Sequence, residues 1–199
     1  MAQTNGDDPK RQAEVRHKIA NLFQLLSTLT RLRMQRAQEA ESRRDLGSLL
    51  EMVSALALVH QRVLSPGGED FALCLGDMAD HWRRRCAGRP IAIELTAAPL
   101  AVHESHASAL ALIANELVAN ALARGFPDER AGVIRVALER AGDDRAALSV
   151  TDDGIGYDPA TVDDARLGLW LIKGLAAQVR GDLSTTADNG VSCRLEFPG

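Results

Sequence analysis

Apolar residues in the first third of the chain recur every three or four positions, which is the period of one face of an α-helix. Two such stretches follow each other. The first lies within residues 10–46, which contain no Pro or Gly, and the second ends at the Ser-Pro-Gly-Gly segment 65–68. The apolar seams run through Val15, Ile19, Leu22, Leu26 and Leu29, and then through Leu46, Leu49, Val53, Leu56, His60 and Val63. This pattern predicts a hairpin of two long helices.

Each predicted helix carries further apolar residues beside its seam. They are Phe23, Leu25 and Leu32 on the first helix, and Leu50, Ala57 and Leu64 on the second. Two antiparallel helices cannot cover this much apolar surface by themselves, whereas a second hairpin would cover it in a four-helix bundle. The sequence therefore predicts a homodimer.

After the Ser-Pro-Gly-Gly segment the pattern changes to mixed helices and strands. Helical spacing is found in residues 70–86, 105–124 and 168–179, and strand patterns in 91–95, 133–139, 146–151 and 192–197. The predicted fold class is α+β, with a helical hairpin followed by an α/β sandwich that has helices on one face of a sheet. The break separates two predicted domains, residues 1–66 and 67–199.

The composition is that of a globular protein. Of the 199 residues, 46% are hydrophobic and 25% are charged, and the net charge of -4 disfavours a dedicated nucleic-acid partner. No apolar run approaches the length that crosses a bilayer, and the start has no signal-peptide core, so we expect a cytoplasmic protein without a membrane anchor. Three cysteines without metal-site spacing, Cys74, Cys86 and Cys193, are expected to be reduced and buried.

Three segments of the second half carry candidate chemistry. In NELVANAL, Glu116 and Asn120 are four residues apart, hence on one helix face, with Asn115 adjacent. A carboxylate and an amide oxygen so arranged can hold a hydrated divalent ion, although a solvated helix face explains such a pair equally well by itself.

The second segment, VTDDGIGYDP, places Asp152 directly after a predicted strand and follows it with Gly154 and Gly156. Glycines let the backbone approach a planar ligand, and a buried carboxylate can accept a hydrogen bond from an exocyclic amine such as that of adenine. The third, LGLWLIKGL, puts Gly168 at a helix start, where free N–H groups favour phosphate. Taken alone, the second segment could be an ordinary turn and the third an ordinary glycine between a loop and a helix. The combination of the three segments in this order is more specific for a nucleotide site than any one of them.

Together the three segments resemble the GHKL ATPase superfamily, and within it the catalytic domain of two-component sensor histidine kinases. NELVANAL resembles the N box, VTDDGIG the DxGxG box, and LGLWLIK the lid and its following helix. In the first half, EVRHKIANLFQLLSTL resembles the phosphoacceptor helix of the HWE-like branch whose motif reads roughly HRxxNNLQ, and ALALVHQRVL resembles its second helix. The resemblance extends from about Glu14 to Phe197.

The resemblance implies a role for each matching residue, with ATP and Mg²⁺ as cofactors. His17 would be the phosphorylated residue and Asn21 would accompany it; Asn120 would ligate Mg²⁺, and Glu116 would assist through a water or as a base. Asp152 would hold the adenine amine, while Gly154 and Gly156 would shape the base pocket. Leu167, Gly168 and Leu169 would lie near the phosphates. His60 falls on the packing seam and is interpreted as a structural or tuning residue.

Some positions depart from the family pattern. Ala20 and Leu22 stand where the family usually has Lys and Asn, and Ala123 and Arg124 replace a Lys-His pair, which removes possible phosphate contacts. Val191 stands in the late Gly-Thr motif, so we expect a hydroxyl near the nucleotide to be missing or displaced.

The leading hypothesis is an ATP-dependent histidine kinase that autophosphorylates on His17 and transfers the phosphoryl group to an aspartate of a receiver domain. The departures leave open a histidine phosphotransfer protein or scaffold with a degenerate nucleotide domain. A GHKL serine kinase that regulates a sigma factor has no evident use for the helical hairpin.

Overall fold

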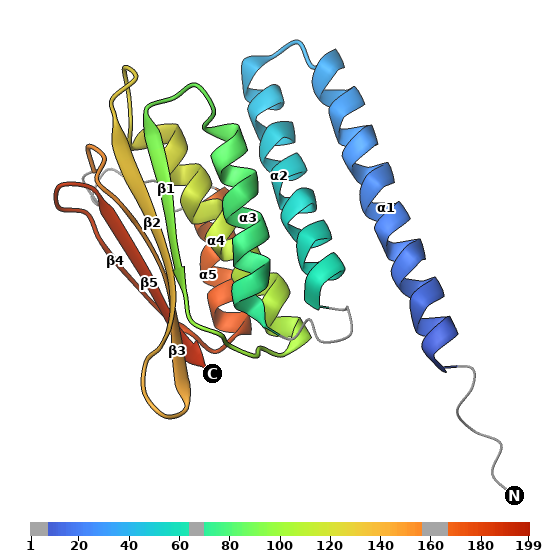
Figure 1. Ribbon diagram of the computed structural model, residues 1–199. Helices are drawn as coiled ribbons and strands as arrows, with labels where there is room; N and C mark the ends of the chain where they lie inside the picture. The colour runs from blue at the N-terminus through green and yellow to red at the C-terminus, as the bar shows by residue number, and fades with distance from the viewer. Residues whose placement is uncertain (1–7, 64–69, 157–166) are drawn as a thin grey trace, which may run out of the picture.

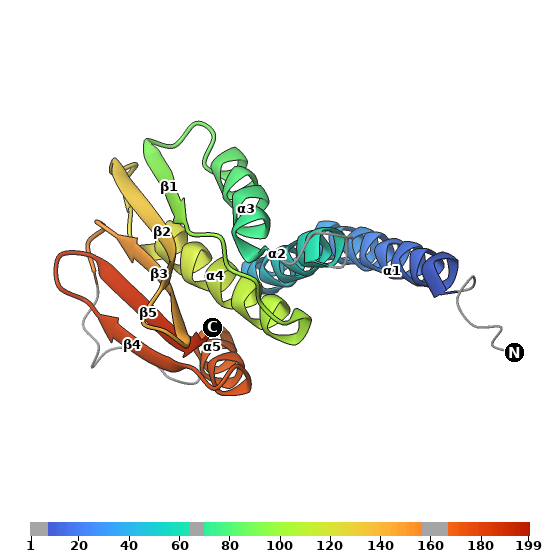
Figure 2. The same cartoon turned by 60° about the horizontal axis from the view of Figure 1, so that its bottom comes forward.

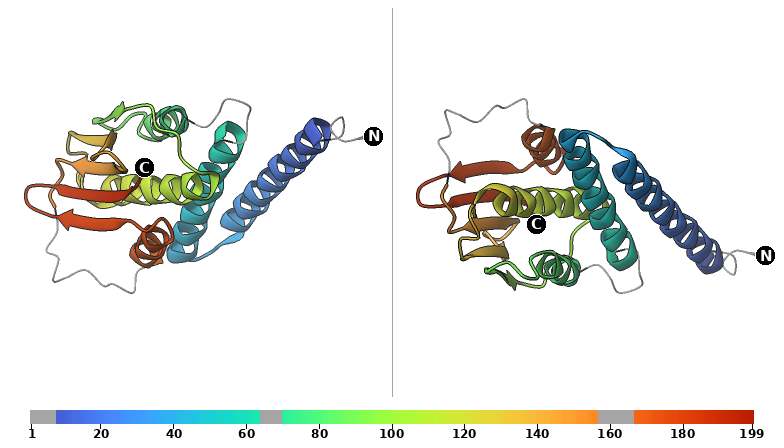
Figure 3. Two further views of the ribbon diagram at one scale, coloured as in Figure 1. Left: turned by 90° about the horizontal axis from the view of Figure 1, so that it is seen from below. Right: turned by 90° about the horizontal axis from the view of Figure 1, so that it is seen from above.

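The computed structural model describes residues 8–63, 70–156 and 167–199 (Figure 1). The chain forms a hairpin of two long helices, α1 (Asp8–Arg36) and α2 (Ala40–Val63), followed by a layered α/β part. Both the hairpin and the α+β class are as the sequence predicts. The helix α2 lies between the α/β part and α1, which is the outermost helix (Figures 2 and 3).

The hairpin turns earlier than the sequence pattern predicts. The first helix ends at Arg36, whereas the uninterrupted pattern continues to Leu46. The side chain of Arg43 stabilises the turn, because its guanidinium donates hydrogen bonds to the carbonyls of Ala37 (2.8 Å) and Gln38 (3.2 Å), which follow the last residue of α1. A cation from the next helix thus satisfies carbonyls that the ended helix leaves without partners.

The α/β part is a five-stranded sheet with helices on one face (Figure 2). Its strand order is β1-β2-β3-β5-β4, and only β1 and β2 pair in parallel. The strands are β1 (Ile91–Ala97), β2 (Gly132–Arg140), β3 (Arg145–Asp152), β4 (Asp182–Thr186) and β5 (Val191–Pro198). The covering helices are α3 (Phe71–Arg85), α4 (Glu104–Arg124) and α5 (Leu167–Gln178).

Each predicted element of this part is present, but sequence analysis missed β4. This strand reads Asp-Leu-Ser-Thr-Thr and pairs only with β5 at the edge of the sheet. Most of its side chains are exposed, so it lacks the apolar alternation by which a half-buried strand is recognised.

The hydrophobic core lies between the sheet and its helices. Its largest fully buried side chains include Trp82, Phe71 and Phe197, and the Trp82 indole N–H donates to Asn115 Oδ1 at 3.1 Å. All three cysteines are free and buried, as predicted. Contrary to the sequence-based expectation, one segment, Ser105–Arg124 of α4, is long and apolar enough to span a membrane. Two-thirds of that window is buried in the protein, which is typical of a core helix.

The helix α2 is packed against the α/β part as well as against α1. Ala55 and Val59 are buried and belong to the same core as α3 and α4. Arg62 forms a two-point ion pair with Asp77 of α3, one contact being 3.0 Å between Nη2 and Oδ1. The predicted domain boundary at residue 66 lies outside the described residues and stays a prediction.

A second polar contact joins α2 to α3. Glu51 accepts a hydrogen bond from His81 at 2.9 Å and pairs with Arg85 at 3.2 Å. Burial favours a higher pKa for Glu51, but the His81 hydrogen bond and the Arg85 charge outweigh it and hold the pKa of Glu51 below its usual value. The carboxylate is therefore ionised when it joins the two helices.

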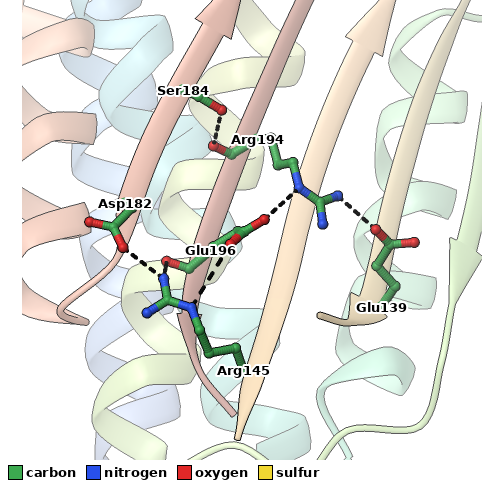
Figure 4. Close-up of polar contacts among 6 residues, drawn as sticks. All are labelled: Glu139, Arg145, Asp182, Ser184, Arg194 and Glu196. Atoms are coloured by element: carbon green, nitrogen blue, oxygen red, sulfur yellow. Dashed lines mark hydrogen bonds and ion pairs between the residues drawn. The ribbon is translucent and has the colours of Figure 1, made fainter. Parts of the chain in front are cut away.

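The uncovered face of the sheet carries a ladder of charged side chains (Figure 4). Arg194 on β5 reaches Glu139 on β2 at 2.6 Å and Glu196 at 3.1 Å, and Arg145 pairs with Asp182 at 2.7 Å. Exposed pairs of this kind contribute little stability individually, but they keep this face hydrated.

Candidate active site

Glu116 and Asn120 lie one turn apart in the second half of α4. Glu116 is only 5% exposed, its Oε1 atom has no hydrogen-bond partner among the described residues, and burial raises the pKa of its carboxyl. Asn120 is half-buried and lines a pocket at this end of the helix. The predicted pair therefore places a buried acceptor beside an amide that reaches the pocket.

The start of α5 packs directly against this pair. A Cβ atom placed on Gly168 would lie 3.0 Å from Glu116 Oε2 and 4.0 Å from Asn120 Nδ2. A larger residue here would require the Glu116 carboxylate to shift, so glycine lets the first turn of α5 approach the carboxylate as it stands. Free N–H groups at a helix start favour negative charge, and here they lie close to Glu116 and Asn120.

Asp152 ends β3 and is buried, with 6% of its surface exposed. Its Oδ1 atom accepts hydrogen bonds from the N–H groups of Gly154 (2.9 Å) and Val191 (3.3 Å). The second bond follows from the register of the sheet, which pairs Asp152 with Val191 on β5. Burial raises the pKa of Asp152, although these two N–H donors lower it.

The loop after Asp152 is held by close backbone packing. A Cβ on Gly154 would lie 2.5 Å from the carbonyl oxygen of Gly125, so alanine does not fit there. Gly156 has φ +67, a left-handed conformation that favours glycine. Both predicted glycines are thus required by the geometry that shapes this side of the pocket.

We call the resulting cavity the Asp152 pocket. It brings together residues of the end of α4, the strands β3 and β5, the loop after β3 and the start of α5. Its lining residues are Leu117, Asn120, Ala121, Arg124, Gly125, Val150, Asp152, Gly156, Leu169, Val191 and Cys193. A mostly apolar cavity with a few converging polar groups is typical of a small-molecule site.

Sequence reasoning missed several lining residues. Val150 lies two residues before Asp152, on the same face of β3, and the sheet register pairs it with Cys193. The period of two in a strand could have identified Val150, but Cys193 required the strand pairing.

The structure shows the surroundings of two positions that depart from the family pattern. Arg124 lines the Asp152 pocket, so this position retains a cation where sequence analysis counted a lost phosphate contact. At the late Gly-Thr motif, Ser192 directs its hydroxyl to Thr151 at 2.9 Å, and no described lining residue of the pocket carries a hydroxyl. The hydroxyl of Ser192 is thus directed to a neighbouring strand, and its position relative to a nucleotide stays a prediction.

His17 lies elsewhere, exposed on α1. It lines a groove of about 890 Å³ between α1, α2 and α3, which we call the His17 groove. The other lining residues are Arg16, Ala20, Phe23, Gln24, Ser27, Thr28, Arg31, Ser54, Ala57, Leu58, His60, Gln61 and His81. An exposed imidazole beside a groove is open to a reaction partner.

His60 holds the turn of α1 that carries His17. Its Nε2 atom lies 3.1 Å from the carbonyl oxygen of Arg16, and its ring centroid lies 5.8 Å from that of Phe23. These packing contacts agree with the structural interpretation of His60. Asn21 is exposed on α1 but is not part of the groove lining, so its predicted role stays a prediction.

The structure assembles the two halves of the predicted site separately. Glu116, Asn120, Asp152, the glycines and Leu169 gather around the Asp152 pocket, whereas His17 lies in its own groove. The two cavities share no lining residue. Chemistry that joins them must bring the contents of the Asp152 pocket to the imidazole of His17, within one chain or between two.

Comparison with protein families gives two matches. The family described as histidine kinase-like ATPase domain matches residues 86–195, and the family described as histidine kinase matches residues 14–81. These matches contain the Asp152 pocket and His17, respectively.

Two curated relatives are similar over most of this chain. Sensor histidine kinase PdtaS of Mycobacterium tuberculosis is 28% identical over 183 residues, which are 85% of this chain and 35% of that protein. Blue-light-activated histidine kinase 1 of Erythrobacter litoralis is 24% identical over 192 residues, or 94% of this chain and 52% of that one. The chain thus spans 35% to 52% of the length of these relatives.

Solved structures share the fold. The histidine kinase domain of the Erythrobacter litoralis EL346 blue-light activated kinase gives a TM-score of 0.70 at 19% identity, covering 88% of this chain and 95% of that domain. Full-length ShkA in complex with AMPPNP gives 0.54 at 20% identity, covering 96% of this chain and 46% of ShkA. With an ATPase-type family match over more than half of its length and a second match over its helical hairpin, this chain belongs to the histidine kinases.

Proposed function

We propose that this chain is an ATP-dependent protein histidine kinase core that phosphorylates itself on His17 and passes the phosphoryl group to an aspartate of a receiver domain. The observation that carries the proposal is Asp152, a buried carboxylate at the floor of a mostly apolar pocket. Its Oδ1 atom takes both backbone hydrogen bonds, which leaves the second oxygen to accept one from the adenine amine.

The residues present fit a hydrated magnesium ion. Glu116 has a buried oxygen without a partner, and Asn120 reaches the pocket beside it. In proteins Mg²⁺ usually keeps several waters and takes its remaining ligands from one or two side chains and the substrate phosphates. When bound, Mg²⁺ would neutralise charge on the transferred phosphoryl group.

This chain's own residues would position the nucleotide. Asn120 would hold the ion, Glu116 would orient a water or act as a base, and the N–H groups from Leu167 to Leu169 would face the phosphates. Phosphoryl transfer needs little covalent help from a protein, so positioning and electrostatics carry most of the catalysis. A related solved kinase, ShkA, was captured with AMPPNP, which supports a nucleotide in this fold.

His17 would be the nucleophile. A neutral imidazole nitrogen attacks phosphorus near neutral pH, and exposure on α1 leaves the ring accessible. The receiver would then dock on the hairpin, where Arg16 and Arg31 line the groove and complement an acidic surface. Lys18, also exposed on α1, contributes less positive charge because it is paired with Glu14 at 2.7 Å.

The alternative of a phosphotransfer scaffold has less support. A domain that does not bind ATP has no need of Asp152 with its two N–H donors, of Gly154 against Gly125, or of Gly168 against Glu116. Arg124 in the pocket also compensates in charge for the Lys-His pair whose loss favoured the scaffold.

The proposal is tested by incubating the purified chain with γ-labelled ATP and Mg²⁺. We expect a labelled protein whose phosphate is stable in alkali and lost in acid, as expected of a phosphoramidate. If the chain binds nucleotide and remains unlabelled, the kinase proposal fails and the scaffold is favoured.

We expect Asp152→Asn to weaken ATP binding by about 1–3 kcal/mol, or about 5-fold to 150-fold in Kd. Asparagine can keep Oδ1 as an acceptor for Gly154 and Val191, but it presents an N–H₂ donor to the adenine amine. Calorimetric titration with ATP measures the effect, and an unchanged affinity would remove Asp152 from this role.

The same variant should not lose stability at pH 7. Because burial raises the pKa of Asp152, protonation of this group stabilises the fold at low pH, and that contribution is lost as the pH rises through the raised pKa. Asparagine removes the buried charge, so its melting temperature should equal or exceed that of the parent at pH 7. The difference in melting temperature between the variant and the parent should decrease as the pH falls.

We further propose that two chains pair through α1. Seven large apolar side chains of the hairpin are between 46% and 56% exposed: Val15, Leu22, Leu25, Leu26, Leu29, Leu32 and Leu49. A stripe of this length is typical of a helix-packing interface. Light scattering of the parent should give a mass twice that of one chain. The double variant Leu22→Asp, Leu29→Asp should have the mass of one chain. A parent that already has the mass of one chain would contradict the dimer.

A further inference from the structure

Helix α5 has an apolar side that nothing in the described structure covers. Ile172 and Ala176 are buried against the core, but Trp170, Gly174 and Ala177 form a second stripe that is exposed. Trp170 is 66% exposed. The chain contains two tryptophans, and the other, Trp82, is buried with its indole N–H bonded to Asn115.

Trp170 is next in sequence to residues of the Asp152 pocket. It follows Leu169, which lines the pocket, and Gly168, which packs on Glu116. Ile155, in the glycine loop that follows Asp152, is also exposed (57%). A large apolar side chain exposed beside a site is a candidate for contact with a partner surface.

The proposed reaction, on which this inference rests, fixes where that surface must be. In-line transfer requires the γ-phosphorus to come within about 3–3.5 Å of the His17 imidazole. The phosphates face the start of α5, and Trp170 is two residues from Gly168, or about 3 Å along the helix axis. The segment around Trp170 therefore meets the hairpin beside His17 at the moment of transfer.

The hairpin offers a matching surface there. The His17 groove, with a volume of about 890 Å³, has room for an indole ring, and part of its lining is apolar. Those apolar residues are Ala20 and Phe23 on α1, and Ala57 and Leu58 on α2. Gly174 lies one turn after Trp170, and a Cβ atom placed on it would meet no described atom within 4 Å, so the surface of α5 is open there to a close approach of the hairpin.

We propose that Trp170 is a positioning residue for phosphoryl transfer, which packs into the His17 groove and so aligns the γ-phosphate with the imidazole. Aromatic anchors of this kind are enriched among the residues that dominate protein contacts. Trp170 would act on the transfer step and not on nucleotide binding, because its side chain is not part of the pocket lining.

The test compares Trp170→Ala with Leu73→Ala, which truncates a leucine 54% exposed on α3, outside both cavities. We expect Trp170→Ala to keep the Kd for ATP and the melting temperature, and to lower the rate of His17 labelling at least tenfold at saturating ATP. Trp170→Phe should recover most of the rate, and Leu73→Ala should label as the parent does. A parent-like rate in Trp170→Ala overturns the inference while leaving the kinase proposal intact; a parent that never labels overturns both.

Mixing two impaired variants shows which hairpin receives the tryptophan. His17→Ala retains Trp170 but has no acceptor, and Trp170→Ala retains the acceptor but labels slowly. If the hairpin belongs to a second copy, the mixture labels the Trp170→Ala chain at a recovered rate, which supports docking of Trp170 at His17. A mixture that remains as slow as Trp170→Ala alone overturns docking on a second copy, and labelling of the mixture at any other residue contradicts docking at His17.

Discussion

We expect the His17→Ala variant to take up no phosphoryl group from ATP while binding the nucleotide with the affinity of the parent chain. The side chain is exposed on α1 and lines a groove that shares no residue with the Asp152 pocket. Its removal therefore takes away the nucleophile without changing the nucleotide site or the core. Labelling with γ-labelled ATP measures the loss of phosphorylation, and calorimetric titration measures the affinity for the nucleotide.

His60→Gln is the matched control, because His60 lies in the same groove and contacts the backbone of Arg16. Losing that contact and the ring contact with Phe23 should lower stability slightly, but the acceptor remains and labelling should persist. Undiminished labelling of His17→Ala would show that another residue receives the phosphoryl group.

The second large effect is expected for Asn120→Ala. This substitution should lower Mg²⁺-dependent phosphorylation on the order of 100-fold or more, since a metal ion contributes several kcal/mol to charge stabilisation in such reactions. Asn120 is half-buried within α4, and its side chain makes no hydrogen bond to the residues that the structure describes, so the fold should be preserved.

The measurement is labelling rate against Mg²⁺ concentration, with ATP affinity determined both with Mg²⁺ and in EDTA. The parent should bind ATP more tightly with the metal, whereas Asn120→Ala should show the same affinity under both conditions. Normal labelling with an unchanged metal dependence would place the ion on other residues.

The fold was largely predictable because its elements carry strong local patterns. Two examples are the 3.6-residue period of α2 and the spacing of Asp152, Gly154 and Gly156. Both are properties of short segments, and the structure contains the helix and the glycine loop that they predict. The end of α1 was not predictable in the same way, because it depends on the Arg43 side chain, six residues beyond Ala37, and not on Gly or Pro. The edge strand β4 is polar, so its sequence lacks the alternation of apolar and polar residues that predicts a strand.

The residues of the candidate site also divide into those that local patterns predict and those that depend on the fold. Residues within one motif, such as Glu116 and Asn120, were found from their spacing, whereas Cys193 enters the pocket only through the pairing of β5 with β3. The separation of His17 from the pocket depends on how α2 packs on α3 and α4, through Val59 and the Arg62–Asp77 pair. No local sequence pattern encodes such a long-range arrangement.

The central claim is that the γ-phosphate of ATP held at Asp152 reaches one imidazole on the hairpin, and mapping the phosphorylated residue tests it most directly. Three histidines, His17, His60 and His81, line the same groove, so the position of the phosphoryl group is decisive. After reaction with ATP and Mg²⁺, peptide mass spectrometry at neutral to basic pH should find phosphohistidine at His17 alone. A phosphoryl group on His60, on His81 or on no histidine would contradict the account.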